Sequence, residues 1–202
     1  DRTKHLALKR FPDPQTAVLP LSMHAGAPAV PVVKPGDMVA VGQKVAEAVG
    51  EISVPVHASV SGRVAAIEPR PHAVMGQCMA IVIENDGKHT LHESVRPGKP
   101  LEQLTPDEIV RIVREAGIAG MGGAGFPSWV KLKPGKPVDM VLLNGCECEP
   151  ILTADHRVML EYADEVVFGL KAIMKAVGAA RGVIVIEDNK PDAVSLMKKI
   201  TA

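Results

Sequence analysis

Five glycines within nine residues make segment 117–127 the densest chemical pattern of the chain. Glycine lets backbone N–H groups turn toward a ligand, and successive inward N–H groups form a concavity that binds anions such as phosphate. Gly120, Gly122 and Gly125 have the spacing of the dinucleotide fingerprint, but that fingerprint should follow a strand, and this one follows a predicted helix. We therefore predict phosphate or cofactor binding here, with a flexible helix-to-strand connection as the alternative.

An aromatic residue and a lysine follow the glycines. The stiff Phe126-Pro127 step is typical of the wall of a binding site and argues against a flexible connection. Lys131 comes six residues after Gly125 and can reach a phosphate or the edge of a cofactor ring. A solvated lysine is the alternative for this side chain.

A second polar segment, 144–150, directly follows an apolar run at 138–143 that predicts a buried strand. Ligands of α/β sheets bind at the carboxyl ends of strands. Asn144 offers amide donors and an acceptor, and Glu147 and Glu149 offer acceptors for sugar hydroxyls or a ring N–H. This segment is therefore the second part of the predicted binding site.

Cys146 and Cys148 lie in the same segment and could be considered as metal ligands, but they are too few. Zinc and iron–sulfur sites need about four ligands, usually in C-x₂-C spacing, and Cys78 is the one other cysteine. We predict no metal site, and two thiols beside the ligand instead. Three cysteines are too few for a disulfide framework, so a reducing, cytosolic setting fits best. No Ser–His–Asp or Cys–His arrangement supports a hydrolase, and we assign no catalytic residue.

The elements before the glycines form a β-rich part. Residues 1–28 are proline-rich and predict an extended lead-in. Residues 29–87 alternate short branched runs with turns such as Lys34-Pro35-Gly36-Asp37, the rhythm of a small all-β domain. Residues 88–104 have the composition of a linker.

Residues 105–202 change to a helical and then an α/β pattern. Thr105, Pro106 and Glu108 form a strong helix start, and Gly117 ends that helix. The apolar runs at 138–143 and 182–186 predict buried parallel strands. The helix positions predicted to face inward are, in the first helix, Ile109, Ile112, Val113 and Ala116 and, in the helix between the strands, Met159, Tyr162, Val166, Leu170, Ile173 and Val177.

A last helix is predicted from Pro191 onward. Two parallel strands alone are marginal, so we expect a partial Rossmann-like fold that residues beyond 202 complete. The predicted fold class is thus α+β or α/β, with a small β domain followed by a partial α/β domain.

Composition excludes some functions. The 202 residues have a formal net charge of zero without a basic stripe, which disfavours nucleic-acid binding. No apolar stretch of about 18 residues predicts a membrane span.

The β part resembles the barrel-sandwich fold of biotinyl and lipoyl carrier domains, through segments 33–39, 42–43 and 56–64. Carriers present a modifiable lysine in an exposed hairpin, and segment 57–62 has none. The resemblance therefore implies an unmodified structural or docking barrel.

Both polar segments together resemble the flavin-binding, NADH-oxidising subunit of respiratory complex I. The resemblance implies that FMN contacts Gly120, Gly122, Gly123, Gly125, Lys131, Asn144 and Glu147, and that Phe126 and Glu149 face NADH. Met121 and Cys146 depart from the family, which usually has Arg and Asp there, and this weakens charge-assisted flavin contacts at those two positions.

The order of barrel and flavin loop, with segments 20–28, 81–87, 153–157 and 186–191, resembles the C subunit of Rnf complexes over nearly the whole chain. The related cobalamin reductase has the same loop near its N-terminus instead. The Rnf resemblance implies an FMN-binding, NADH-oxidising subunit of an NADH:ferredoxin-type complex coupled to ion translocation.

Such a subunit is peripheral on the cytoplasmic face of the membrane and contacts the other subunits. The cysteine runs that hold the family's [4Fe-4S] clusters are absent here, so we expect an N-terminal fragment that is inactive alone. The alternatives are a non-catalytic docking or scaffold module and the related cobalamin reductase flavoprotein.

Overall fold

The computed structural model describes residues 3–121 and 123–202, and they form two compact units. The barrel unit contains residues 12–104 and 108–132, and the α/β unit contains residues 1–11, 105–107 and 133–202. Residues 108–132 thus belong to the same compact unit as the β part. The boundary that the sequence suggests between residues 104 and 105 stays a prediction.

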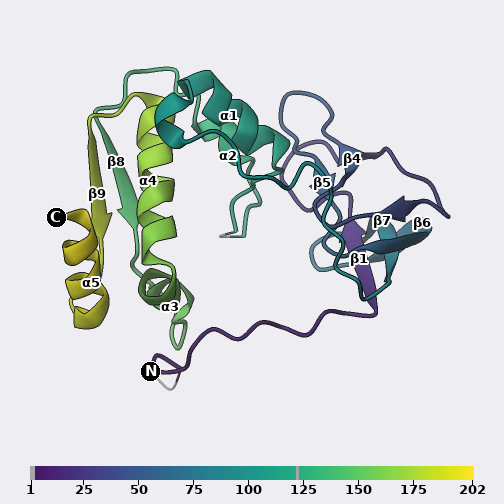
Figure 1. Cartoon of the computed structure of the whole chain (residues 1–202), viewed down its shortest axis with the longest axis horizontal. Helices are drawn as coiled ribbons and strands as arrows, with labels where there is room; N and C mark the ends of the chain where they lie inside the picture. Colours follow the sequence, from purple (N-terminus) through teal and green to yellow (C-terminus); the bar gives the residue numbers. More distant parts are fainter. Residues whose placement is uncertain (1–2, 122) are drawn as a thin grey trace. The chain divides into compact units, whose positions relative to one another are not determined.

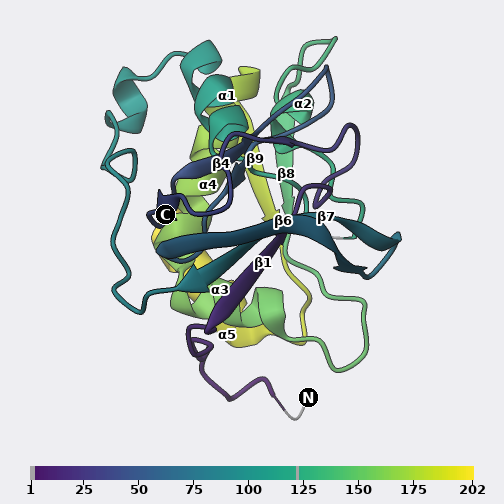
Figure 2. The same ribbon diagram turned by 90° about the vertical axis from the view of Figure 1, so that its right-hand side faces the viewer.

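The barrel unit is built from two antiparallel sheets. One sheet has the order β1-β7-β6-β3 and the other β2-β4-β5, and Figure 2 shows β1, β6 and β7 side by side. Their bounds are β1 Thr16–Pro20, β2 Val30–Pro31, β3 Met38–Val39, β4 Lys44–Glu47, β5 Val56–His57, β6 Gly62–His72 and β7 Gly76–Asn85. The core is aliphatic, and Val45, Val64, Ile81 and Ile83 are fully buried in it.

Strand β1 lies inside segment 1–28, which we predicted only as an extended lead-in. It pairs antiparallel with β7, from Thr16 opposite Glu84 to Pro20 opposite Ala80. Because β1 is at the edge of its sheet, the missing N–H of Pro20 is tolerated there. Ala17 and Leu19 point into the core, so this segment is part of the barrel.

Three short helices follow the strands: η1 Leu101–Gln103, α1 Pro106–Glu115 and α2 Ser128–Lys131. Apart from the first two residues of α1, they belong to the barrel unit. Helix α1 begins at Pro106 as predicted. Its predicted inner face was partly wrong, because Ile109 and Val110 are buried whereas Ile112 is 46% exposed. Gly117 follows the helix with φ +70° and donates its N–H to Arg114 O (3.0 Å), a left-handed helix end.

An ion pair joins strand β4 to helix α1. Lys44 Nζ lies 2.6 Å from Glu115 Oε2 and 3.2 Å from Glu47 Oε1. The hydrogen bond to Glu115 is the main cause that raises the pKa of Lys44, and the same bond holds the pKa of Glu115 below its usual value. Next to them, burial and then the charge of Lys44 lower the pKa of His57, against the weaker opposing effect of Glu115 and Glu47.

Acidification should therefore destabilise the barrel unit in two steps. A lowered His57 pKa means that the unfolded chain binds the proton more readily, so stability falls as the pH drops below 6.5. A lowered Glu115 pKa removes further stability as the pH falls through and below 4.5. We expect the urea midpoint, followed by the fluorescence of Trp129, to decline from about pH 7 to about pH 4. His57→Gln should abolish the upper step alone, and an unchanged upper step in that variant would contradict this explanation.

The α/β unit contains the two predicted parallel strands, β8 Met140–Asn144 and β9 Arg181–Val185. The prediction that these strands are buried was wrong, because every residue of both strands is at least partly exposed. Its helices are α3 Ala154–Glu161, α4 Ala163–Val177 and α5 Pro191–Thr201. Helix α4 contacts both strands and the other two helices (Figure 1). The last helix was predicted correctly.

We predicted one helix between the two strands, and the structure has two, α3 and α4. The chain leaves helical geometry at Tyr162 (φ −131°, ψ 40°), which separates them. Tyr162 and Ile173, predicted to face inward, are 48% and 36% exposed. The buried side chains of the unit include Met159, Ala163, Val167, Ala193 and Met197. The inner face of α4 is therefore shifted from the predicted one.

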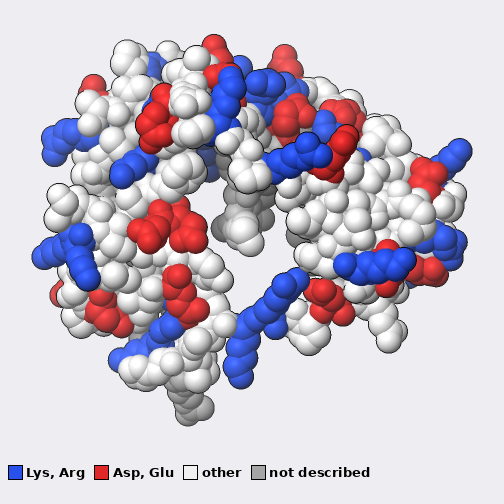
Figure 3. Space-filling model, viewed as in Figure 1, with Lys and Arg blue, Asp and Glu red and all other residues white. Residues whose placement is uncertain are grey.

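Positive and negative side chains are mixed on one face of the molecule. On the face in Figure 3, basic and acidic side chains are interspersed, which is the distribution that the balanced composition suggests. Among the described residues, no helix is both long and apolar enough to span a bilayer.

Candidate functional site

The glycine loop is closed at its base and open at its tip. Ala119 forms an antiparallel bridge with Pro127, and Gly120 donates its N–H to Phe126 O (2.8 Å). At the tip, Met121 is 100% exposed. Gly123 has φ +105°, and a Cβ built there would meet no atom within 4 Å. The predicted site residue Gly122 lies outside the described residues. At Met121 and Gly123 the loop is thus accessible to a ligand.

The predicted wall and the predicted cation lie together beside this loop. Lys131 Nζ is 5.7 Å from the centroid of the Phe126 ring, within the range of a cation–π contact. Lys131 ends the short helix α2 and is exposed. The barrel unit therefore contains the described loop glycines, Phe126 and Lys131 in one place.

The second polar segment begins at the carboxyl end of β8, as predicted. Asn144 is exposed, and its Oδ1 accepts the N–H of Cys146 (3.1 Å). Gly145 donates its N–H to Val185 O (2.8 Å), and a Cβ built on it would lie 2.8 Å from Met159 Sδ. The chain thus passes tightly over the sheet edge, while Glu149 remains exposed.

Glu147 differs from the other predicted site residues because its side chain has no exposed area. Its carboxylate accepts the N–H groups of Asp155 (2.7 Å) and His156 (3.3 Å) at the start of α3, which satisfies helix N–H groups that lack partners within the helix. It also pairs with Lys190, whose side chain is 5% exposed. Glu187 completes the cluster, 3.3 Å from Lys190 Nζ. In this unit Glu147 fixes the strand end.

Burial and hydrogen bonding have opposite effects on the pKa values of Glu147 and Lys190. Burial by itself would raise the pKa of Glu147, but the bonds from Lys190 and from the two N–H groups outweigh it, and the pKa is lowered. Burial would likewise lower the pKa of Lys190, but its bonds to Glu147 and Glu187 raise it. Both groups are therefore held in their charged forms.

Sequence reasoning missed Lys190 and Glu187 as partners of the site. One signal was available, because parallel strands end at the same sheet edge, and Asn144 is opposite Val185 in the register. Residues that follow the two strand ends must therefore meet. His156 and Asp192 meet there as well, with Nε2 2.9 Å from Oδ1.

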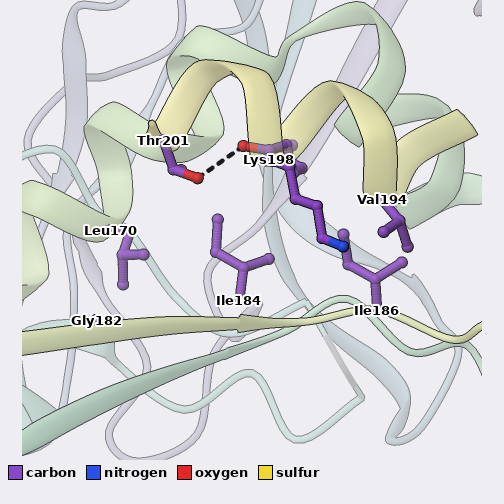
Figure 4. Close-up of a pocket in the computed structure, with 8 residues that line it drawn as sticks. Leu170, Gly182, Ile184, Ile186, Val194, Lys198 and Thr201 are labelled. Atoms are coloured by element: carbon purple, nitrogen blue, oxygen red, sulfur yellow. Dashed lines mark hydrogen bonds between the residues drawn. The ribbon is translucent and has the colours of Figure 1, made fainter.

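The structure thus gathers the candidates into two groups, one in each unit. Asn144, Glu147 and Glu149 belong to the α/β unit. Among the described residues, no three or more His, Cys, Asp or Glu side chains are grouped as metal ligands. An apolar pocket between α4, β9 and α5 contains none of the candidates and is lined by Leu170, Gly182, Ile184, Ile186, Val194, Met197, Lys198 and Thr201 (Figure 4).

Comparison with known proteins assigns both halves of the chain. Residues 1–88 match the family described as the RnfC barrel sandwich hybrid domain, and residues 113–202 match the Nuo51 FMN-binding domain. The chain is 52% identical to the C subunit of the Na⁺-translocating ferredoxin:NAD⁺ oxidoreductase complex of Acetobacterium woodii, over 92% of this chain and 42% of that protein. This chain belongs to the RnfC family.

Two further C subunits are also similar to this chain over nearly its whole length. The C subunit of the proton-translocating ferredoxin:NAD⁺ oxidoreductase complex of Clostridium ljungdahlii is 47% identical over 98% of this chain and 45% of its own length. The C subunit of the ion-translocating oxidoreductase complex of Rhodobacter capsulatus is 40% identical over 98% of this chain and 38% of its own length. The chain thus spans less than half of these RnfC relatives. The predicted fold class, a barrel-sandwich domain followed by an α/β region, is confirmed.

Proposed function

We propose that this chain is the part of an RnfC protein that binds FMN and receives electrons from NADH, within an NADH:ferredoxin-type complex coupled to ion translocation. The accessible tip of the glycine loop, in a chain of this family, is the main support. FMN held by the glycine loop, Lys131 and Asn144 would supply the chemistry that turns a hydride into single electrons. The [4Fe-4S] clusters that receive them would lie outside this chain. The other subunits of the complex are the proposed partners, at the cytoplasmic face of the membrane.

The chain's residues have distinct parts in this proposal. Gly120, Gly123 and Gly125 let the loop approach the flavin, and the exposed Lys131 and Asn144 supply polar contacts. Gly122, outside the described residues, belongs to the same proposal.

The carboxylate of Glu147 is already occupied by two N–H groups and Lys190. It therefore serves FMN by holding the strand end in place rather than by a free carboxylate oxygen. Phe126 and Glu149 would face the nicotinamide nucleotide.

Substitution of Gly123 tests the flavin assignment. Its Cβ would meet no protein atom within 4 Å, so Gly123→Ala should fold while its methyl group and the strain at positive φ disturb the surface offered to FMN. We expect the Kd for FMN, measured by flavin fluorescence on the full-length protein, to rise about tenfold. Gly87→Ala is the matched control, because Gly87 also has positive φ (+69°) and open space. Equal FMN affinity in both variants, or no flavin binding by the parent, would refute the assignment and leave the docking-module alternative.

The electron donor is tested on the same preparation. Anaerobic NADH should bleach the flavin absorbance, and NADPH should not. Bleaching by both nucleotides at the same rate would contradict the choice of NADH.

A further inference from the structure

The glycine loop is attached to the barrel at Gly125. Ala25 donates its N–H to Gly125 O (2.8 Å). A Cβ built on Gly125 would lie 3.1 Å from both His24 Cα and Met23 O. The loop backbone and the segment after β1 are therefore in direct contact.

A second contact secures the chain that follows the loop. Trp129, on α2, donates its Nε1–H to Ser53 O (3.3 Å), and the Arg114 guanidinium covers the Trp129 ring at 4.7 Å. Before the loop, a Cβ built on Gly117 would lie 2.5 Å from Pro55 O. Both flanks of the loop thus rest on the barrel.

A buried polar cluster joins the two barrel segments that make these contacts. Ser53 and His24 are 1% and 6% exposed. The Ser53 hydroxyl donates to Ala27 O (2.9 Å), and His24 Nε2 lies 3.0 Å from both Ser53 Oγ and Ala27 O. The N–H of Val54 reaches the same His24 nitrogen (3.3 Å). Buried networks in which each group has a partner rigidify their surroundings.

We propose that the barrel is a positioning device for the flavin loop, in which His24 and Ser53 hold the segments that anchor Gly125 and Trp129. The inference rests on the proposed function in assigning FMN to this loop. His24 and Ser53 are positioning residues, because they act through Gly125 and Trp129.

The physical reason is the entropy of glycine. A loop of glycines loses much conformational freedom when it orders around a ligand. Anchoring both flanks of the loop removes part of that freedom before the ligand arrives, and such preorganisation increases affinity. The absence of a modifiable lysine from segment 57–62 agrees with a barrel that has a structural task.

Trp129 reports on the anchoring without any flavin, because it is the single tryptophan of the chain. In Ser53→Ala we expect faster hydrogen exchange of the indole N–H and stronger acrylamide quenching. Ser61→Ala is the matched control, because Ser61 is also 1% exposed in the barrel and has two hydrogen bonds elsewhere, to Asp86 and from the N–H of Thr90. An indole that behaves alike in both variants would overturn the proposal.

Flavin affinity is the second readout, on the full-length protein. Ser53→Ala should raise the Kd for FMN about fivefold, and Ser61→Ala should leave it within about twofold. Trp129→Phe keeps an aromatic ring but removes the indole N–H, and should act like Ser53→Ala. If the parent protein binds no FMN, the proposed function is wrong, and so is the effect of the barrel on flavin affinity. The tryptophan measurements still test whether Ser53 anchors Trp129. If the parent binds FMN and all variants bind equally well, the positioning role alone is overturned.

Discussion

Replacing Lys190 with methionine is expected to lower the unfolding free energy of the α/β unit by about 3–5 kcal/mol. The substitution leaves the Glu147 carboxylate, which has no exposed area, without the cation that offsets its desolvation. The two N–H groups of α3 remain as partners, but they neutralise no charge. The loss should appear as a lower midpoint of thermal unfolding by circular dichroism.

Two further variants separate the buried charge from other effects. Lys199→Met changes an exposed lysine of the same helix α5 and should stay within about 0.5 kcal/mol of the parent. Adding Glu147→Gln to Lys190→Met removes both charges and should recover part of the lost stability. A double variant no more stable than Lys190→Met would show that the cost comes from packing and not from an unpaired carboxylate.

The same cluster shows where sequence reasoning succeeded and where it stopped. The apolar run before Asn144 and the polar residues after it placed the strand end correctly. The partner of Glu147 is 43 residues away, and no local periodicity connects the two. Their meeting depends on the parallel register of β8 and β9, a tertiary property.

The barrel shows a similar limit. Branched runs and turn residues predicted the later strands, because those patterns are local. Strand β1 was missed, since prolines on both sides of it suggested irregular chain and its pairing partner β7 is distant in sequence. The contact of Ala25 with Gly125 is also long-range. The glycines predicted a loop that approaches a ligand, but only the fold shows which surface holds that loop.

Gly26→Ala is expected to destabilise the barrel unit by about 3–5 kcal/mol. Gly26 has φ +99°, and a Cβ built there would lie 2.0 Å from Ile52 O. The backbone atom cannot give way without breaking the bond in which Ala27 donates its N–H to Ile52 O (3.0 Å). Positive φ and a backbone clash therefore act together at this position.

Gly36→Ala isolates the first of these two costs. Gly36 has nearly the same φ (+97°), and a Cβ there would meet nothing within 4 Å, so this variant should lose only about 1–2 kcal/mol. Urea unfolding followed by Trp129 fluorescence measures both variants. Equal losses would show that the close approach of Gly26 to Ile52 contributes nothing to stability.

The fluorescence of the two folded variants also tests whether the turn at Gly26 is coupled to the flavin loop. Gly26 is next to Ala25, whose N–H binds Gly125 O, and two residues from His24, which lies against Ser53. A shift forced at Gly26 must therefore move the segment that anchors the flavin loop. In folded protein, Gly26→Ala should alter the quenching of Trp129 by acrylamide, whereas Gly36→Ala should not. A stability loss without any change at Trp129 would mean that the barrel absorbs the clash locally and that its contact with the loop is independent of this turn.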